Sequence, residues 1–333
     1  MRTVSTFPLV TGIMIVIGAG LALPARAQTS SASPGQTGKP SLQQALAALK
    51  VPPSWFDTTT TTWDMNQPWA KGRLEIRRLL AGDEARVRQG VKLTWLYAQK
   101  KDIGDGHELP MYLFMSGQYA WAVREYPAYL QRVAGKGAVH AYLCHASCLA
   151  HFGEHAQALG VLDQAAKDLP PSPWAINARA NLLNARGDIH AAMGEVAKAK
   201  ECYQAAIQLY PTSNQPYGRH LLARQAAKVQ TKLDLLTFQS LATARLRDGR
   251  YTGKTLGYAD NPPMEVTVTV RDGKIADVQV KHQEKIDLGA ATIIPRRIVE
   301  QQSLKVDAVT GATVTSQAVV DGAYKALKQA GLK

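Results

Sequence analysis

The segment from residue 307 to residue 316 concentrates side chains that could do chemistry. It reads DAVTGATVTS and contains three threonines and one serine. Gly311 and Ala312 leave room for a bulky group to approach the backbone. The segment lies just before an expected helix start, where free backbone N–H groups favour a phosphate. The pattern indicates a phosphate-bearing ligand, although a hydroxyl-rich helix cap is the simpler interpretation of the spacing alone.

Short elements with strand-like and helix-like patterns surround this segment. Residues 264–270 read MEVTVTV, which alternates with period two and predicts a strand with one buried face. Asp272-Gly273 is a hairpin-turn signal, and residues 275–280 alternate again. We therefore expect an antiparallel pair of strands. The helices expected in this part of the chain cover residues 213–247, 299–305 and 316–329.

Several separated motifs occur in order from Asp248 to about Ala330. They are Asp248-Gly249-x-Tyr251-x-Gly253, Val266-Thr267-Val268, Asp272-Gly273-Lys274-Ile275, His282-x-Glu284, Ile294-Pro295, Val306-Asp307-Ala308 and Gly311-Ala312-Thr313 with Thr315-Ser316. Together they resemble the FMN-binding domain shared by the RnfG and NqrC subunits of respiratory electron-transfer complexes. The resemblance covers about a quarter of the chain. It departs from the family at residues 285–287, which read KID where a Thr-Pro-Gly-like turn is common.

The resemblance implies a cofactor and the residue that carries it. In that family, a separate flavin transferase uses FAD to join FMN through a phosphoester to the threonine of an Asp-x-x-Ser/Thr-Gly-Ala-Thr motif. The corresponding acceptor in this chain is Thr313. We assign no catalytic residue and no metal ligand. The expected cofactor-binding residues are Asp307, Thr310, Gly311, Ala312, Thr313, Thr315 and Ser316.

A glycine-centred pattern recurs through residues 103–230. After both Gly153 and Gly194, a small residue follows at +5, a large apolar residue at +9, a small residue at +12 and a proline at +17. Gly117 keeps the early spacings but lacks the closing proline. This pattern is typical of helical hairpins, because the glycine allows a turn between two helices, the small residues allow the helices to cross closely, and the proline ends the second helix. The pattern resembles the tetratricopeptide repeat, with two units at Gly153 and Gly194 and a weaker one at Gly117; a generic array of helical hairpins is the alternative.

The N-terminus is typical of a secretory signal peptide. Arg2 is followed by a mostly apolar run over residues 7–23, and Ala25-Arg26-Ala27 fits the small-x-small pattern before a cleavage site. The run is short for a membrane-spanning helix of ~20 residues, so an uncleaved anchor is the weaker alternative. We expect cleavage after Ala27 and an extracytoplasmic (periplasmic or secreted) location. Residues 28–40 are rich in Ser, Thr, Gly and Pro, which is typical of a flexible linker.

Composition and cysteine usage narrow the function classes. The formal net charge of +13 favours acidic partners or anionic surfaces, but no interleaved basic and aromatic stripe indicates nucleic acid. No G-x-G-x-x-G follows a strand, so we do not infer a direct NAD(P)H site. Cys144, Cys148 and His151 share one expected helix face. We favour packing by small apolar thiols there, with a metal or redox site as the alternative. A disulfide between Cys202 and either of the other cysteines stays open.

These observations predict a multidomain protein. We expect a signal peptide over residues 1–27, a linker over 28–40, an all-α tetratricopeptide-like array over 41–236, and a small α+β FMN-binding domain with an antiparallel sheet over 237–333. Its expected function is that of an electron carrier rather than a stand-alone enzyme. The expected partners are a flavin transferase, a redox partner protein in a membrane electron-transfer complex and a protein bound by the repeats. The alternatives are a scaffold whose FMN domain is unloaded or regulatory, and a flavin-dependent reductase.

Overall fold

The computed structural model describes residues 40–332 apart from residues 81, 217, 237–245, 258, 260, 285–286, 288, 307 and 310–311. The side chains of residues 220 and 313 are also outside this description. The expected signal peptide and the linker up to residue 39 therefore lie outside the described residues. Within the described part of the chain, no helix combines the length and the apolar character that crossing a bilayer requires.

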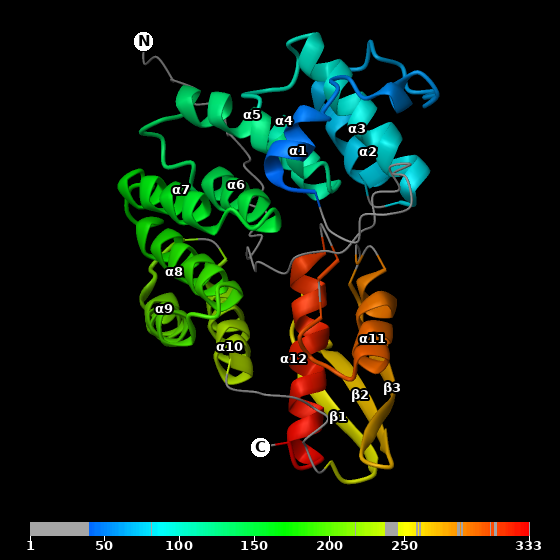
Figure 1. Ribbon diagram of the computed structural model, residues 1–333, viewed down its shortest axis with the longest axis vertical. Coiled ribbons are helices and arrows are strands. Elements are labelled where there is room, and N and C mark those ends of the chain that lie inside the picture. The colour runs from blue at the N-terminus through cyan, green and yellow to red at the C-terminus, as the bar shows by residue number, and fades with distance from the viewer. Residues whose placement is uncertain are drawn as a thin grey trace, which may run out of the picture.

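The N-terminal part is an array of helices that mostly pair as antiparallel hairpins. Figure 1 shows the array curving from α2 and α3 through α6–α9 to α10, which lies beside α12. The elements are α1 (Leu42–Ala47), η1 (Ser54–Phe56), α2 (Trp69–Leu80), α3 (Glu84–Gln99), α4 (Glu108–Met115), α5 (Tyr119–Arg132), α6 (Val139–His151), α7 (His155–Lys167), α8 (Ala175–Ala192), α9 (Val196–Leu209), η2 (Tyr210–Thr212) and α10 (Arg219–Leu236).

The glycines of the repeat pattern form the turns inside three hairpins. Gly117, Gly153 and Gly194 have φ of 77°, 80° and 75°, the left-handed conformation that glycine adopts without strain. They separate α4 from α5, α6 from α7, and α8 from α9. A Cβ atom at Gly187 would overlap the Tyr203 ring, so α8 and α9 cross closely because this position is glycine. The predicted turning role and close helix crossing are confirmed.

The C-terminal part is a three-stranded antiparallel sheet covered by two helices. The sheet order is β1 (Gly249–Thr255), β2 (Met264–Arg271) and β3 (Lys274–Lys281). Figure 1 shows α11 (Ala290–Gln301) and α12 (Thr313–Gln329) packed against this sheet. Alternate residues of β2 are buried in a core with both helices, namely Met264, Val266, Val268 and Val270. The two predicted strands and their hairpin are confirmed.

Three helix predictions need correction. The helix expected over residues 299–305 instead begins at Ala290 and includes Pro295, because Ala290, Ile294 and Ile298 form a buried stripe that outweighs the missing proline N–H. The helix expected over residues 213–247 begins at Arg219 and is described as far as Leu236. Residues 237–245 lie outside the described part, and Leu246 and Arg247 belong to no helix. Helix α12 starts three residues before the expected residue 316.

Helix α10 joins the array to the C-terminal α+β part through two adjacent sides. On one face, the Lys232 ammonium lies 2.8 Å from an Asp188 carboxylate oxygen of α8. On an adjacent side, Thr231 donates a hydrogen bond to Asp321 of α12, and the Tyr324 hydroxyl donates to Asp234 at 3.1 Å. The boundary expected between residues 236 and 237 falls where α10 ends, although the helix packs on both sides of it.

Replacing Asp188 with alanine should destabilise the array by about 3 kcal/mol, because it leaves the buried Lys232 ammonium without its carboxylate partner. The Lys232 side chain is 15% exposed and that of Asp188 is 5% exposed. Urea unfolding followed by circular dichroism measures the loss. Asp163→Ala is the matched control, since Asp163 is 60% exposed in its pair with Arg186 and its removal should cost less than about 1 kcal/mol. Equal effects of the two substitutions would contradict the prediction.

Candidate functional site

The predicted acceptor lies at the start of the C-terminal helix. Thr313 is the first residue of α12, a helix of 17 residues. The preceding residue, Ala312, is buried and has no side chain that can accept from the first turn. Helix starts present unpaired N–H groups and a partial positive charge, so a negatively charged group is favoured at this position. The local backbone is therefore suited to a phosphate attached at Thr313.

Two other hydroxyls of the segment have intramolecular partners. Thr315 Oγ1 donates to Glu284 Oε2 at 2.8 Å, and Ser316 Oγ accepts from the Val309 backbone N–H at 3.0 Å. Thr315 and Ser316 are 0% and 1% exposed. We predicted both as cofactor-binding residues, and the structure shows them bracing the loop before α12. Asp307, Thr310 and Gly311 lie outside the described residues, as does the side chain of Thr313.

Glu284 holds together two loops that are distant in the sequence. Besides accepting from Thr315, its Oε1 accepts from the Ala259 backbone N–H at 2.9 Å. A Cβ atom at Gly257 would overlap the same carboxylate, so glycine is needed for this approach. Glu284 belongs to the His282-x-Glu284 motif of the sequence. It is half-buried in the structure and connects the β1–β2 loop to the first turn of α12.

Two cations from α10 also reach this region, and sequence reasoning missed both. Lys228 Nζ donates to the Val314 backbone carbonyl at 3.2 Å, one residue after the predicted acceptor. Arg224 is buried, and its Nη1 donates to the Gly257 carbonyl at 2.9 Å. These contacts span 86 and 33 residues of sequence. Helical spacing in α10 gave no signal that pointed to them, because α10 looks like one more helix of the array.

Comparison with known families identifies the C-terminal fold. The family model described as an FMN-binding domain matches residues 257–328, which include Glu284, Thr313 and Val314. The chain carries an FMN-binding domain. The model described as a tetratricopeptide repeat matches residues 180–213, which cover most of the α8–α9 hairpin. Both resemblances predicted from the sequence are confirmed, together with the fold class of a helical array followed by a small α+β domain.

A curated relative contains a similar stretch. The NADH:acrylate oxidoreductase of Vibrio harveyi is 33% identical over 131 residues, which cover 38% of this chain and 13% of that protein. The match thus spans about an eighth of the relative's length. No solved structure matches the chain significantly. The likeness supports a flavoprotein.

The cysteine and histidine residues of α6 form part of the helical core. Cys144, Cys148 and Cys202 are all free thiols, so the structure contains no disulfide among them. Cys144 Sγ lies 3.6 Å from His140 Nε2, and burial raises the pKa of the Cys144 thiol to about 12. Cys144 and Cys148 are 2% and 0% exposed and belong to the apolar core of the array. Packing is therefore the better account of this helix face.

Acid should destabilise the array through the histidines of α6. Burial lowers the pKa of His140 and of His145 to about 4, and the charge of His107 contributes at His140. The folded pKa lies below the unfolded value of 6.5, so their contribution is complete above pH 6.5 and is lost as the pH falls towards 4. Protonation of each histidine should lower the free energy of unfolding by about 1.4 kcal/mol per pH unit between these two pKa values. Urea unfolding at several pH values measures the slope, and His140→Gln/His145→Gln should flatten it; an unchanged slope contradicts the assignment.

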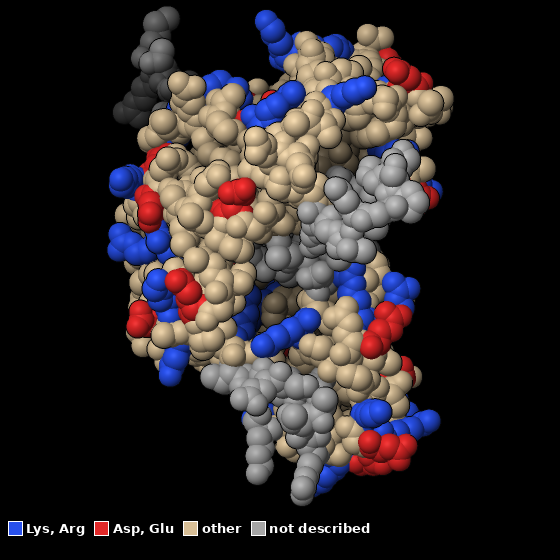
Figure 2. Space-filling view, in the orientation of Figure 1, with Lys and Arg blue, Asp and Glu red and all other residues tan. Residues whose placement is uncertain are grey.

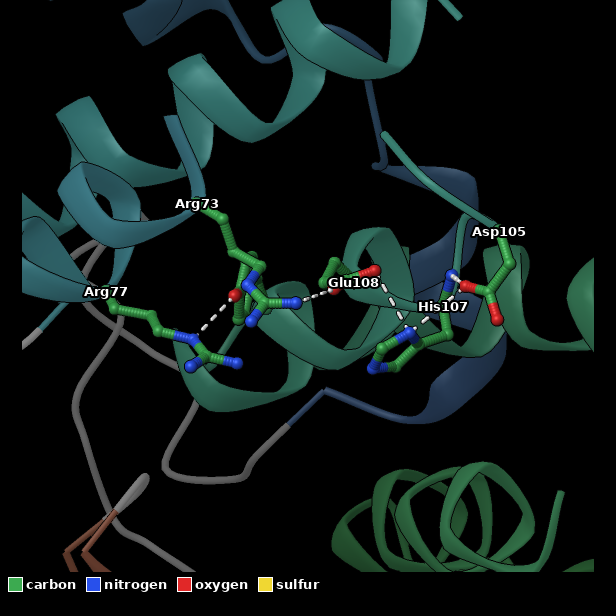
Figure 3. Close-up of polar contacts among 6 residues, drawn as sticks. Arg73, Arg77, Asp105, His107 and Glu108 are labelled. Carbon is green, nitrogen blue, oxygen red and sulfur yellow. Dashed lines mark hydrogen bonds and ion pairs between the residues drawn. The ribbon is translucent and has the colours of Figure 1, made fainter. Parts of the chain in front are cut away.

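One further group of potential ligands lies between α3 and α4, drawn in Figure 3. Asp105, His107 and Glu108 place ligand atoms within 4.8 Å of one another, as the only such group in the described part of the chain. His107 Nδ1 lies 3.1 Å from Asp105 and 3.0 Å from Glu108, and Arg73 lies 3.4 Å from Glu108. Burial opposes protonation of His107, but the bonds to Glu108 and Asp105 raise its pKa. An ion-pair network accounts for this group, and we assign no metal to it.

Proposed function

We propose that this protein is an exported electron-transfer flavoprotein that carries FMN in phosphoester linkage to Thr313. The observation that carries the proposal is the position of Thr313 in an FMN-binding domain, at a helix start whose N-cap residue is alanine. The neighbouring hydroxyls of Thr315 and Ser316 are buried and bonded to protein groups, which leaves them poorly placed as acceptors.

The residues around Thr313 fit a phosphate-linked cofactor. The N–H groups of the first turn of α12 favour the phosphate charge. Gly257 and Glu284 fix the β1–β2 loop against that turn. Bound FMN would supply one- or two-electron chemistry, while the protein fixes its position and tunes its potential.

The proposed location is outside the cytoplasm, where the protein would interact with several other proteins. A flavin transferase would load FMN from FAD, with AMP as the leaving group. A redox protein, in a membrane electron-transfer complex, would exchange electrons with the flavin, and the repeats would bind a protein partner. The support for a protein ligand is the tetratricopeptide hairpin, since helical repeats stack into extended binding surfaces.

Intact mass spectrometry of the full chain co-expressed with a flavin transferase tests the proposal. Loading should add the mass of one FMN less one water, and the same spectrum should report cleavage after Ala27. In-gel fluorescence under ultraviolet light should persist after denaturation because the bond is covalent. A wild-type chain that stays at the unmodified mass, in the presence of an active transferase, would refute covalent attachment.

A flavin-dependent reductase is a second candidate, favoured by the name of the Vibrio harveyi relative, NADH:acrylate oxidoreductase. The two functions differ in what reduces the flavin. NADH added alone to the loaded protein should leave the flavin absorbance unchanged if the protein is a carrier. Rapid bleaching by NADH alone would establish the reductase in its place.

A further inference from the structure

The last helix of the array reaches the flavin-attachment turn. Lys228 Nζ on α10 lies 3.2 Å from the carbonyl oxygen of Val314, the residue that follows Thr313. Arg224 lies one turn earlier on α10 and bonds the carbonyl of Gly257, in the loop that Glu284 ties to the same turn. Residues four apart share one face of a helix. One face of α10 therefore presents two cations to the site.

Helix α10 is fixed in place around Lys228. Thr231, one turn later, donates to the buried carboxylate of Asp321, which also accepts from Thr255 at 2.7 Å. Lys232, one turn after Lys228, is paired with Asp188 of α8. Helix α10, which carries Lys228, is therefore bonded to both α8 and α12. Figure 2 shows Lys and Arg side chains around the hollow between the array and the FMN-binding domain.

The charges around Lys228 leave it protonated at neutral pH. Burial lowers its pKa to about 8, Asp321 and Glu284 raise it, and Arg224 and Lys232 lower it. Both carboxylates have other hydrogen-bond partners. Asp321 accepts from Thr231, Thr255 and Lys325. Glu284 accepts from Thr315 and from the Ala259 N–H. A half-buried positive charge thus lies next to the turn where the flavin would be attached.

We propose that Lys228 is an electrostatic partner of the FMN group on Thr313, so that the repeat array sets part of the flavin's reduction potential. The inference rests on the function proposed above. Reduction adds electrons to the flavin ring, and a nearby positive charge stabilises the electron-rich form. The half-buried position strengthens the effect, because water and salt screen such a charge less than one on the surface. Lys228 acts here as a positioning and tuning residue.

The test is the midpoint potential of flavin-loaded protein, measured by spectroelectrochemical titration at pH 7. Lys228→Gln should reduce the preference for the reduced flavin about tenfold, which lowers the potential of a two-electron couple by about 30 mV. Lys228→Arg keeps the charge and should stay close to the wild-type value. Lys328→Gln removes the same charge from the far end of α12, ~21 Å along the helix from Val314. That separation exceeds the ~8 Å screening length at physiological salt, so this control should also stay near wild type.

The outcomes separate this inference from the function on which it rests. Intact mass first establishes whether each variant carries FMN and circular dichroism whether it folds. A wild-type chain without covalent flavin overturns the proposed function and this inference together. Loaded and folded proteins with equal potentials for wild type, Lys228→Gln and Lys328→Gln overturn this inference alone. If Lys228→Gln fails to fold, the loaded Lys228→Met variant takes its place, and an unaltered potential there, or a shift equal to that of Lys328→Gln, overturns the inference.

Discussion

Thr313→Ala should leave the chain without covalent flavin when it is co-expressed with a flavin transferase. Alanine removes the oxygen that forms the phosphoester, and the two described hydroxyls that follow are buried and bonded to Glu284 and to the Val309 N–H. No described neighbour is therefore placed to replace it. Intact mass and in-gel fluorescence measure the loss, which should be complete.

Two matched variants make the Thr313 result specific. Thr313→Ser keeps a hydroxyl at the first position of α12 and should retain fluorescence, since a helix start tolerates serine well. Thr310→Ala tests the other threonine of the motif, and peptide mapping of the wild type should place the added mass on the peptide that contains Thr313. Fluorescence that persists in Thr313→Ala, or mass mapped to Thr310, would overturn the assignment of the acceptor.

Gly253→Ala should unfold the FMN-binding domain under conditions in which the wild type is folded. A Cβ atom at this position in β1 would overlap the carbonyl oxygen of Gly322 and lie 2.9 Å from the Ala326 N atom. Both obstacles are backbone of α12, so no side-chain rotation relieves them and the helix has to leave the sheet. Overpacking of this kind costs about 3 kcal/mol or more.

The control for Gly253 is the same substitution where the space is open. A Cβ atom at Gly160 of α7 would meet nothing within 4 Å. Gly160→Ala should therefore be neutral or stabilise by up to about 1 kcal/mol, since alanine favours a helix over glycine. Urea unfolding followed by circular dichroism and flavin fluorescence compares the two variants. Similar midpoints for Gly253→Ala and the wild type would show that α12 does not lie on β1 as closely as the structure has it.

Much of the fold could be predicted because its signals are local. The period-two run of β2, the Asp272-Gly273 turn and the glycines of the helical hairpins each act within about ten residues, and each is where the sequence placed it. Helix α11 was misplaced because Pro295 is a strong local signal against a helix, whereas the burial of Ile294 and Ile298 depends on a sheet formed elsewhere. Local sequence signals fail to predict an element whose position depends on packing against residues distant in the sequence.

The residues of the candidate site also fall into those that local sequence signals could predict and those that they could not. Residue types and order marked the segment around Thr313, and the FMN-binding domain model confirms the domain that contains it. The roles of Thr315 and Ser316 in cofactor binding stay predictions, and the sequence could not show their intramolecular partners, which are Glu284 and the Val309 N–H. Lys228 and Arg224 could not be found, since their contacts depend on how α10 docks onto a domain that begins after it.

Helix α10 determines which piece of the chain can be transplanted. A fragment that begins at residue 248 contains every strand and helix of the FMN-binding fold, yet it lacks the Thr231 hydroxyl that bonds Asp321 and the lysine that reaches Val314. It would expose the surface of α12 that α10 covers. A fragment that begins at Arg219 keeps these contacts but leaves Lys232 without Asp188. Grafting the flavin module onto another protein would therefore require α10.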